Sequence, residues 1–254
     1  MAPLATARRP TVASRTLAEQ LQPIVWLHDS IRKHGHVRID VDRARARILV
    51  GRTGFDADTL LRAATDLPRA FSRTAAAFER TGIEATPRVS ALHAMSVDAV
   101  SQVLAWANSE SPPSDPNMKL ARKLAAVVGN AVLSRAASDV MSAFSLPAWK
   151  WPQCPCCGAS PDLCLTTNTG RKLVCWRCDT QWATLLRGCL GCGASAPPAI
   201  ARVASPYLGY ELAICGACGR YLKERRGPLT HDLLVERALT TALDEAAQQR
   251  GLRS

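Results

Sequence analysis

The chain has 254 residues, 47% of them hydrophobic, so it can bury one large core or two smaller ones. No stretch approaches the run of about 18 apolar residues that a membrane span needs, and Glu19, Gln20 and Gln22 interrupt any signal-peptide core. The formal net charge of +11 suits a polyanion or an acidic protein partner, although the excess of Lys and Arg is spread along the chain. These features predict a soluble, cytoplasmic protein that does not cross a membrane.

The first 150 residues are rich in Ala, Leu and Arg, which favour helix. Residues 37–50 alternate at first like a strand and fit a helix equally well. Helical spacing of apolar residues is clear over 55–80 and over 96–108, where Ser96 is placed as an N-cap.

The clearest predicted helix covers residues 117–144. Its apolar residues repeat every four positions and form one buried stripe, made of Leu124, Val128, Val132, Ala136, Val140 and Phe144. We therefore interpret residues 1–150 as a mostly α-helical N-terminal domain whose apolar stripes form its core.

All ten cysteines lie in the next part of the chain, where they form four CxxC pairs and leave two over. The pairs are Cys154 with Cys157, Cys175 with Cys178, Cys189 with Cys192, and Cys215 with Cys218. Two residues between thiols place both sulfurs on one side of a tight turn, where they can bind a metal ion at roughly 2.3 Å. Each pair is followed by a residue that tolerates the left-handed backbone of such a turn, namely Gly158, Asp179, Gly193 and Gly219.

Other uses of these cysteines fit the pattern less well. Disulfide frameworks belong to small secreted domains, whereas thiols remain reduced in the cytoplasm. A redox CxxC normally occurs once, at the start of a helix in a βαβ unit, and the residues around these pairs do not indicate such a unit. We therefore interpret the pairs as metal ligands. Zinc and iron both accept four thiolates, so the ligand set does not separate them.

The spacing of the pairs predicts how they share metal ions. Successive pairs are separated by 17, 10 and 22 residues, and the two longer gaps suit the hairpin within a four-cysteine module. We predict a first module over residues 151–186 and a second over 187–228, each holding one ion, with a cross-braced pairing as the alternative. Outside the pairs, Cys164 is expected to be a buried small hydrophobic residue, and Cys156 to be idle, an alternative ligand or an oxidisable thiol.

The last part of the chain, residues 229–254, has the pattern of one helix. Thr230 is placed as its N-cap and Gly251 lies just past its end. Its apolar stripe consists of Val235, Leu239, Ala242, Leu243 and Ala246. The predicted fold class is therefore multidomain, with a helical N-terminal domain, two small β modules of rubredoxin-like or zinc-ribbon type, and a C-terminal helix.

The order of these motifs resembles that of the formate dehydrogenase accessory proteins. The resemblance runs from Cys154 to Gly251 through "CPCCGASP", "RKLVCWRCDTQW", "LLRGCLGCG", "AICGACGRYLKE" and the closing "HDLLVERALTTALDEAAQQRG". Trp182, four residues after the second pair, and the "YLK" of residues 221–223 set it apart from a generic zinc ribbon.

The resemblance implies two metal ions, reported as iron in the family, each bound by four of the paired cysteines. It also implies a cytoplasmic protein that binds the catalytic subunit of a molybdenum- or tungsten-dependent formate dehydrogenase and is needed for that enzyme to become active. The sequence leaves open whether the chain forms a homodimer.

The sequence shows no motif typical of an enzyme, neither a Ser, His and Asp set, nor a Gly-rich phosphate loop, nor paired carboxylates. His34 and His36 flank Gly35, and a solvated loop is the simpler interpretation of them than a metal site. We predict a protein that is not an enzyme. The alternative is a zinc-ribbon nucleic-acid-binding protein, with Trp176 beside Arg177 and Tyr221 beside Arg220 as candidates for base stacking.

Overall fold

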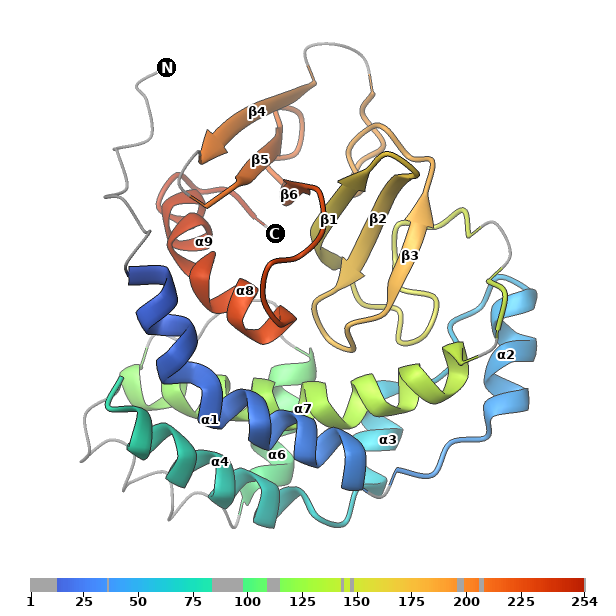
Figure 1. The fold of residues 1–254 in the computed structure, drawn as a ribbon. Helices are drawn as coiled ribbons and strands as arrows, with labels where there is room; N and C mark the ends of the chain where they lie inside the picture. The colour runs from blue at the N-terminus through green and yellow to red at the C-terminus, as the bar shows by residue number, and fades with distance from the viewer. Residues whose placement is uncertain are drawn as a thin grey trace.

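A computed structural model of the chain shows a layer of helices beneath a β-sheet, with two further helices beside the sheet (Figure 1). The structure describes residues 13–35, 37–83, 98–108, 115–142, 144–146, 149–195, 199–205 and 208–253. The predicted fold class is confirmed, because helices precede the cysteines, strands surround them and helices follow.

The helical layer is built around α7 (Pro116–Met141), which packs against α1, α4 and α6. The other helices of the layer are α1 (Ala13–His34), α2 (Val41–Leu49), α3 (Ala57–Ala63), α4 (Leu67–Thr81) and α6 (Ala99–Asn108). Asp115 caps α7 by accepting a hydrogen bond from the amide of Met118. The predicted stripe is buried from Leu124 to Val140, whereas Phe144 lies beyond the end of the helix and is only partly buried.

The structure assigns the secondary structure of residues 37–50 and 55–80. Residues 37–50 contain a helix and not a strand, because Asp40 caps α2 by accepting from the amide of Arg43. The helical spacing over 55–80 belongs to two separate helices, α3 and α4. Pro68 explains the break, because proline fits the first turn of a helix but not its interior. Ser96, expected to be an N-cap, lies outside the described residues.

Although the sequence has no uninterrupted run of about 18 apolar residues, α7 contains the one described segment that is long and, on average, apolar enough to cross a membrane, Met118–Met141. Of the most apolar 18 residues of this segment, 72% are buried within the protein. Gly129 lets α6 approach closely there, because a Cβ at this position would lie 2.3 Å from Trp106 Cζ3. This segment is therefore the central helix of a packed core.

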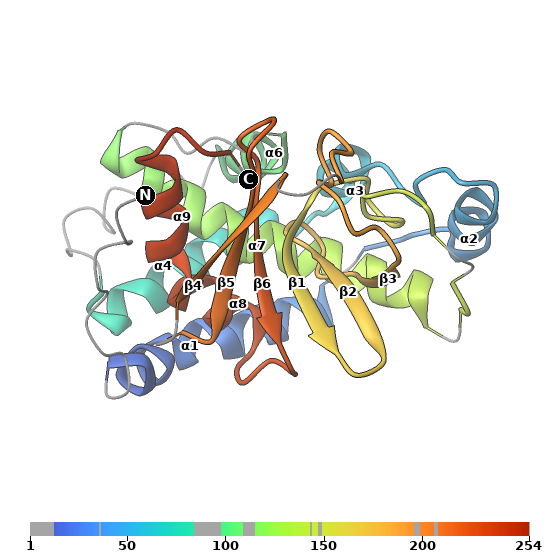
Figure 2. The same cartoon turned by 90° about the horizontal axis from the view of Figure 1, so that it is seen from above.

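The two cysteine-rich modules form a single six-stranded sheet (Figure 2). The strands are β1 (Pro161–Thr167), β2 (Gly170–Cys175), β3 (Gln181–Thr184), β4 (Ile200–Ser205), β5 (Tyr210–Cys215) and β6 (Tyr221–Arg226). Their order is β3-β2-β1-β6-β5-β4, so each module is an antiparallel meander, and the two meet where β1 and β6 pair in parallel. The sequence did not predict this joint, because pairing between remote strands leaves no local pattern.

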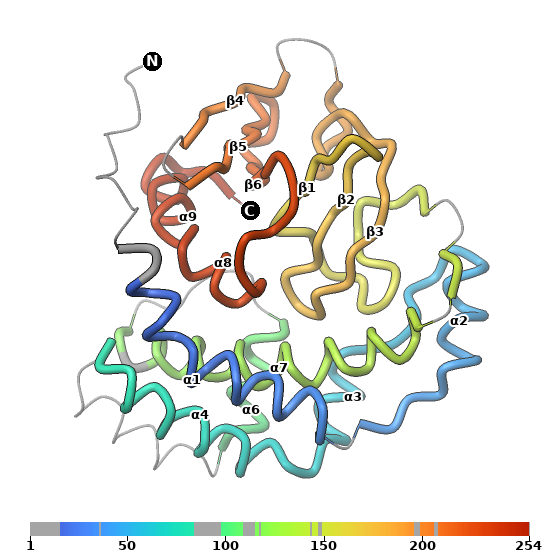
Figure 3. Tube along the Cα trace, in the orientation of Figure 1, coloured from blue at the N-terminus to red at the C-terminus, as the bar shows by residue number. Residues whose placement is uncertain are grey.

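The single C-terminal helix predicted from the sequence is two helices, α8 (Leu233–Leu239) and α9 (Thr241–Gln248). Asp232, and not Thr230, caps α8 by accepting from the amide of Leu234. The chain turns between the helices at Thr240, whose hydroxyl donates to the carbonyl of Glu236. After α9 the chain returns to the sheet, where the amide of Tyr221 donates to the carbonyl of Arg253 (Figure 3).

Candidate metal centres

All four CxxC pairs form the same turn. In each turn the residue after the second cysteine has a left-handed backbone and donates its amide to the carbonyl of the first cysteine, at 2.9 to 3.2 Å. The φ angles are +75° at Gly158, +58° at Asp179, +74° at Gly193 and +68° at Gly219. Asp179 is the only residue other than glycine with a positive φ in the described chain. The positive φ expected after each pair is confirmed.

The sulfur atoms gather into two groups of four, and within each group they all lie within 4.8 Å of one another. The first group, centre 1, consists of Cys154, Cys157, Cys175 and Cys178, and the second, centre 2, of Cys189, Cys192, Cys215 and Cys218. The grouping follows the chain order and not the cross-braced alternative, and all of these cysteines are free thiols.

The distances between sulfurs fit a tetrahedral ion. Across centre 1, Sγ of Cys154 lies 3.6 Å from that of Cys178, and Sγ of Cys157 lies 3.5 Å from that of Cys175. The corresponding distances across centre 2 are 3.5 and 3.7 Å. A tetrahedral ion with bonds of about 2.3 Å would separate its sulfurs by about 3.8 Å. Both groups are therefore suitable for a zinc or iron ion with four thiolate ligands.

The two centres differ in exposure. All four cysteines of centre 1 are buried. In centre 2, Cys215 is buried, Cys189 and Cys218 are partly buried, and Cys192 is exposed. Solvent can therefore reach the ligands of centre 2 but not those of centre 1.

Close packing of the thiols changes their acidity. Burial raises the pKa of Cys175 and Cys178 well above the ordinary thiol value. Burial also acts to raise the pKa of Cys154, but hydrogen bonds from its neighbouring thiols outweigh burial and hold that pKa well below the ordinary value. In centre 2, the backbone amide of Cys218 lowers the pKa of Cys215 to about 7. Each group therefore holds one thiol that ionises readily, Cys154 in centre 1 and Cys215 in centre 2. This suits metal binding, because metal ions bind thiolates.

The two remaining cysteines lie outside both groups. Cys164 is buried in β1, as expected for a small hydrophobic residue. Cys156 is also fully buried, which disfavours the oxidisable thiol among the interpretations left open for it, because oxidation needs access to the sulfur. Among the described residues no histidine joins a metal group, and His34 is exposed at the end of α1.

The turn around Cys156 attaches centre 1 to the helical layer. The carbonyls of Pro155 and Cys156 accept the amides of Gly54 and Phe55, each at 2.9 Å. These bonds pair the backbone of the first turn with that of residues 54–55. Centre 1 is therefore held between the sheet and the loop that follows α2.

A second attachment explains why one of the four turns has aspartate in place of glycine. The carboxylate of Asp179 accepts from Asn130 Nδ2 of α7 at 3.0 Å and from Arg237 Nη1 of α8 at 2.7 Å. Asn130 Oδ1 in turn accepts from His28 Nε2 of α1 at 2.7 Å. Arg237 also donates to Asp162 Oδ2 at 2.8 Å. Sequence reasoning missed this network, and its one signal was the Asp in a position where the other turns have Gly.

Of the aromatic residues considered for base stacking, Tyr221 is buried and Trp176 is partly buried. Trp176 packs edge to face against Trp106 of α6, with ring centroids 5.2 Å apart. Tyr221 is buried, and its hydroxyl donates to Asp244 Oδ1 at 2.8 Å. The buried ring of Tyr221 is therefore not presented for stacking on a nucleic-acid base.

The fold and the thiol groups define a protein with a helical layer and two joined modules of the zinc-ribbon type. No protein-family model matches the chain, and no curated protein matches it. Among solved structures, the crystal structure of the FdhE protein from Pseudomonas aeruginosa has a similar fold, with a TM-score of 0.58 and 15% sequence identity. The similarity covers 94% of this chain and 90% of that chain, so it includes the helical layer, which the cysteine motifs do not reach. The likeness agrees with the resemblance predicted from those motifs.

Proposed function

We propose that this protein is a cytoplasmic accessory protein for the maturation of a formate dehydrogenase, that it binds the catalytic subunit of that enzyme, and that it is not itself an enzyme. The observation that carries the proposal is the joined pair of four-cysteine modules on a helical layer, a fold shared with FdhE along most of both chains. The cysteine motifs and the fold both support this proposal.

We infer that the eight grouped cysteines bind two ions, iron or zinc. Four thiolates around one ion leave no open coordination position, so the bound metal would stabilise the docking scaffold and not activate a substrate. Iron in the same sites could also change oxidation state, which would make the protein responsive to redox conditions. Metal analysis and an absorption spectrum of protein purified without oxygen distinguish the two, because thiolate-to-iron charge-transfer bands are absent for zinc.

A deletion strain of the source organism tests the function. We expect the strain to lack formate dehydrogenase activity, and the wild-type chain to restore it and to recover the catalytic subunit in a pull-down. The variant Cys192→Ser removes a ligand of centre 2 at an exposed position and should restore less activity. Cys164→Ala, which changes a cysteine outside both centres, is the matched control. Unchanged activity in the deletion strain, with no subunit recovered, refutes the proposal.

A further inference from the structure

One face of the sheet carries a cluster of charged side chains that no helix covers. Side chains alternate between faces along a strand, and the strand registers place five charged residues on the same face, namely Arg171, Arg202, Glu211, Glu224 and Arg226. The opposite face carries Tyr210, Tyr221 and Lys223, whose polar atoms bind residues of α8 and α9. The C-terminal helices thus cover one face and leave the charged one open.

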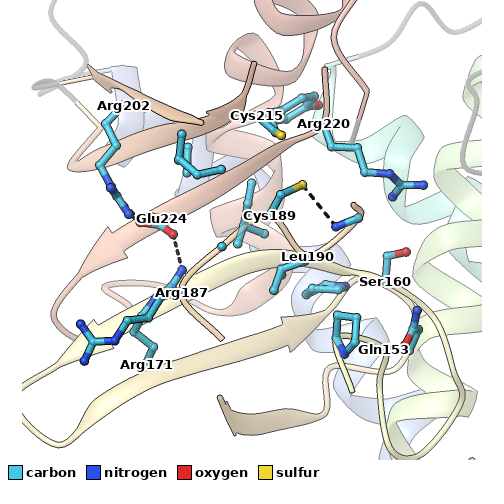
Figure 4. Close-up of a pocket in the computed structure, with 18 residues that line it drawn as sticks. Gln153, Ser160, Arg171, Arg187, Cys189, Leu190, Arg202, Cys215, Arg220 and Glu224 are labelled. Atoms are coloured by element: carbon cyan, nitrogen blue, oxygen red, sulfur yellow. Dashed lines mark hydrogen bonds and ion pairs between the residues drawn. The ribbon is translucent and has the colours of Figure 1, made fainter. Parts of the chain in front are cut away.

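The charged face is hollowed into a cleft that begins beside centre 2 (Figure 4). At that end a hollow of about 160 Å³ is lined by Gln153 and Ser160, which flank the first turn, and by Cys189 and Cys215 of centre 2. It adjoins a wider groove of about 610 Å³, with which it shares Arg171, Arg202 and Glu224. No described residue that lines either one belongs to a helix. We call this feature the arginine cleft and define it by Arg171, Arg187, Arg202, Arg226, Glu211 and Glu224.

Positive charge exceeds negative charge in the arginine cleft. Glu224, with a side chain only 10% exposed, accepts from Arg171 Nη2 and, at 3.2 Å, from Arg202 Nη2. Glu211 lies between Arg202, at 3.9 Å, and Arg226, at 3.5 Å. These three guanidinium groups therefore have only two carboxylates as ion-pair partners within the cleft.

Arg187 and Arg220 add two further guanidinium groups at the narrow end of the cleft, and within the described chain Arg187 forms no hydrogen bond or ion pair. The planar fork of arginine suits a bidentate bond to a carboxylate. Arg187 can therefore donate to an anion bound in the cleft. Arg202, whose side chain is half exposed, can also contact it.

An apolar side chain stands beside these arginines. Leu185, the first residue after β3, is 94% exposed and borders a hollow shared with Arg171, Arg187 and Arg202. An exposed leucine next to a basic cleft suits a ligand that has both carboxylates and an apolar group. A protein segment has both, whereas a nucleic acid would need stacking partners. The one aromatic residue lining the cleft, Tyr221, is buried.

We propose that the arginine cleft is a docking site for an acidic segment of a partner protein, which places carboxylates against Arg187 and Arg202 and an apolar side chain against Leu185. Centre 2 supplies Cys189 and Cys215 to the lining of the site, so the loading of that centre would shape it. The inference concerns the chemistry of the segment and holds whether or not the partner is a formate dehydrogenase.

Fluorescence anisotropy of a labelled peptide tests the site on the full-length, metal-loaded protein. The probe alternates Glu with Ser around a central Leu, and its matched version has Gln in place of Glu. We expect the Glu peptide to bind at low salt, and the double variant Arg187→Gln, Arg202→Gln to weaken binding by roughly tenfold or more. The control Arg69→Gln, Arg73→Gln makes the same charge change on exposed positions of α4 and should weaken it by less than about twofold.

Further variants and competitors distinguish specific docking of the peptide from other causes of binding. Leu185→Ser leaves the charge unchanged and should still weaken the Glu peptide, which non-specific attraction would not explain. Equal binding of the Gln peptide, or equal weakening in the control variant, overturns the proposal. Tighter binding of a single-stranded oligonucleotide that displaces the peptide assigns the cleft to nucleic acid instead, and displacement by millimolar inorganic phosphate assigns it to small anions. Circular dichroism and metal content establish that each variant is folded.

Discussion

Replacing Arg237 by Met should destabilise the junction between centre 1, the helical layer and α8. In addition to its bonds to Asp162 and Asp179, Arg237 donates from Nη2 to the carbonyl of Cys175 at 2.9 Å. Burial acts to lower the pKa of Arg237, but the two carboxylates outweigh burial and raise it, so the guanidinium is charged at every pH at which the protein is folded. The variant retains much of the apolar side chain and removes the charge and the three donors.

The magnitude follows from the burial of the partners. The side chains of Asp162 and Asp179 are 16% and 18% exposed, so water compensates only in part for the lost cation. Removing one member of a buried ion pair costs about 3–5 kcal/mol, and an exposed pair contributes about 0–1 kcal/mol. The Arg237 side chain is 22% exposed and forms ion pairs with two carboxylates. We therefore expect Arg237→Met to lower the free energy of unfolding by about 3 kcal/mol. For a chain of this length, that corresponds to a fall in Tm of about 6–12 °C.

Thermal unfolding followed by circular dichroism on metal-loaded protein measures the effect. Arg250→Met is the matched control, because Arg250 is exposed and, among the described residues, its guanidinium donates only to the carbonyl of Ala246. Its effect should stay within about 0.5 kcal/mol. Adding Asp162→Asn and Asp179→Asn to Arg237→Met should recover part of the loss, since no carboxylate is then left without a cation. A fall in Tm of less than about 2 °C for Arg237→Met refutes the reasoning.

Three further predictions concern acid stability and the metal centres. Buried Glu236 accepts hydrogen bonds from Tyr210 and the Thr230 segment, which outweigh burial and lower its pKa, so its stabilising contribution is complete above about pH 4.5 and is lost as the pH falls through the lower folded-state pKa. Glu236→Gln should therefore flatten the fall of Tm in acid, and an unchanged acid slope contradicts this. Cys156→Ser should keep two ions per chain and Cys157→Ser should lose one, as measured by elemental analysis; loss of metal in the first variant shows that the register is wrong. A chelator should remove the ion of centre 2 first, because Cys192 is exposed, and simultaneous release of both ions speaks against the inferred difference.

The sequence by itself determined the local features of the metal centres. A CxxC pair followed by a residue at positive φ is a property of a few neighbouring residues, so Gly158, Gly193 and Gly219 could be assigned to their turns without a structure. The stripe of α7 was equally local, because a helix places every fourth residue on one face. The composition also indicated where the helical part ends and the cysteine-rich part begins.

The tertiary structure alone decided how these parts meet. The parallel pairing of β1 with β6 joins the two modules through strands that are remote in sequence, and no spacing of cysteines encodes it. The break at Thr240 and the choice of Asp232 as the N-cap depend on Glu236, whose carboxylate binds the Thr230 segment and the sheet. The arginine cleft is likewise a product of register, since Arg171, Arg202 and Arg226 come from three strands and become neighbours only in the sheet. Patterns in a sequence record what each residue does to its neighbours along the chain, whereas docking surfaces and buried networks depend on contacts between distant segments.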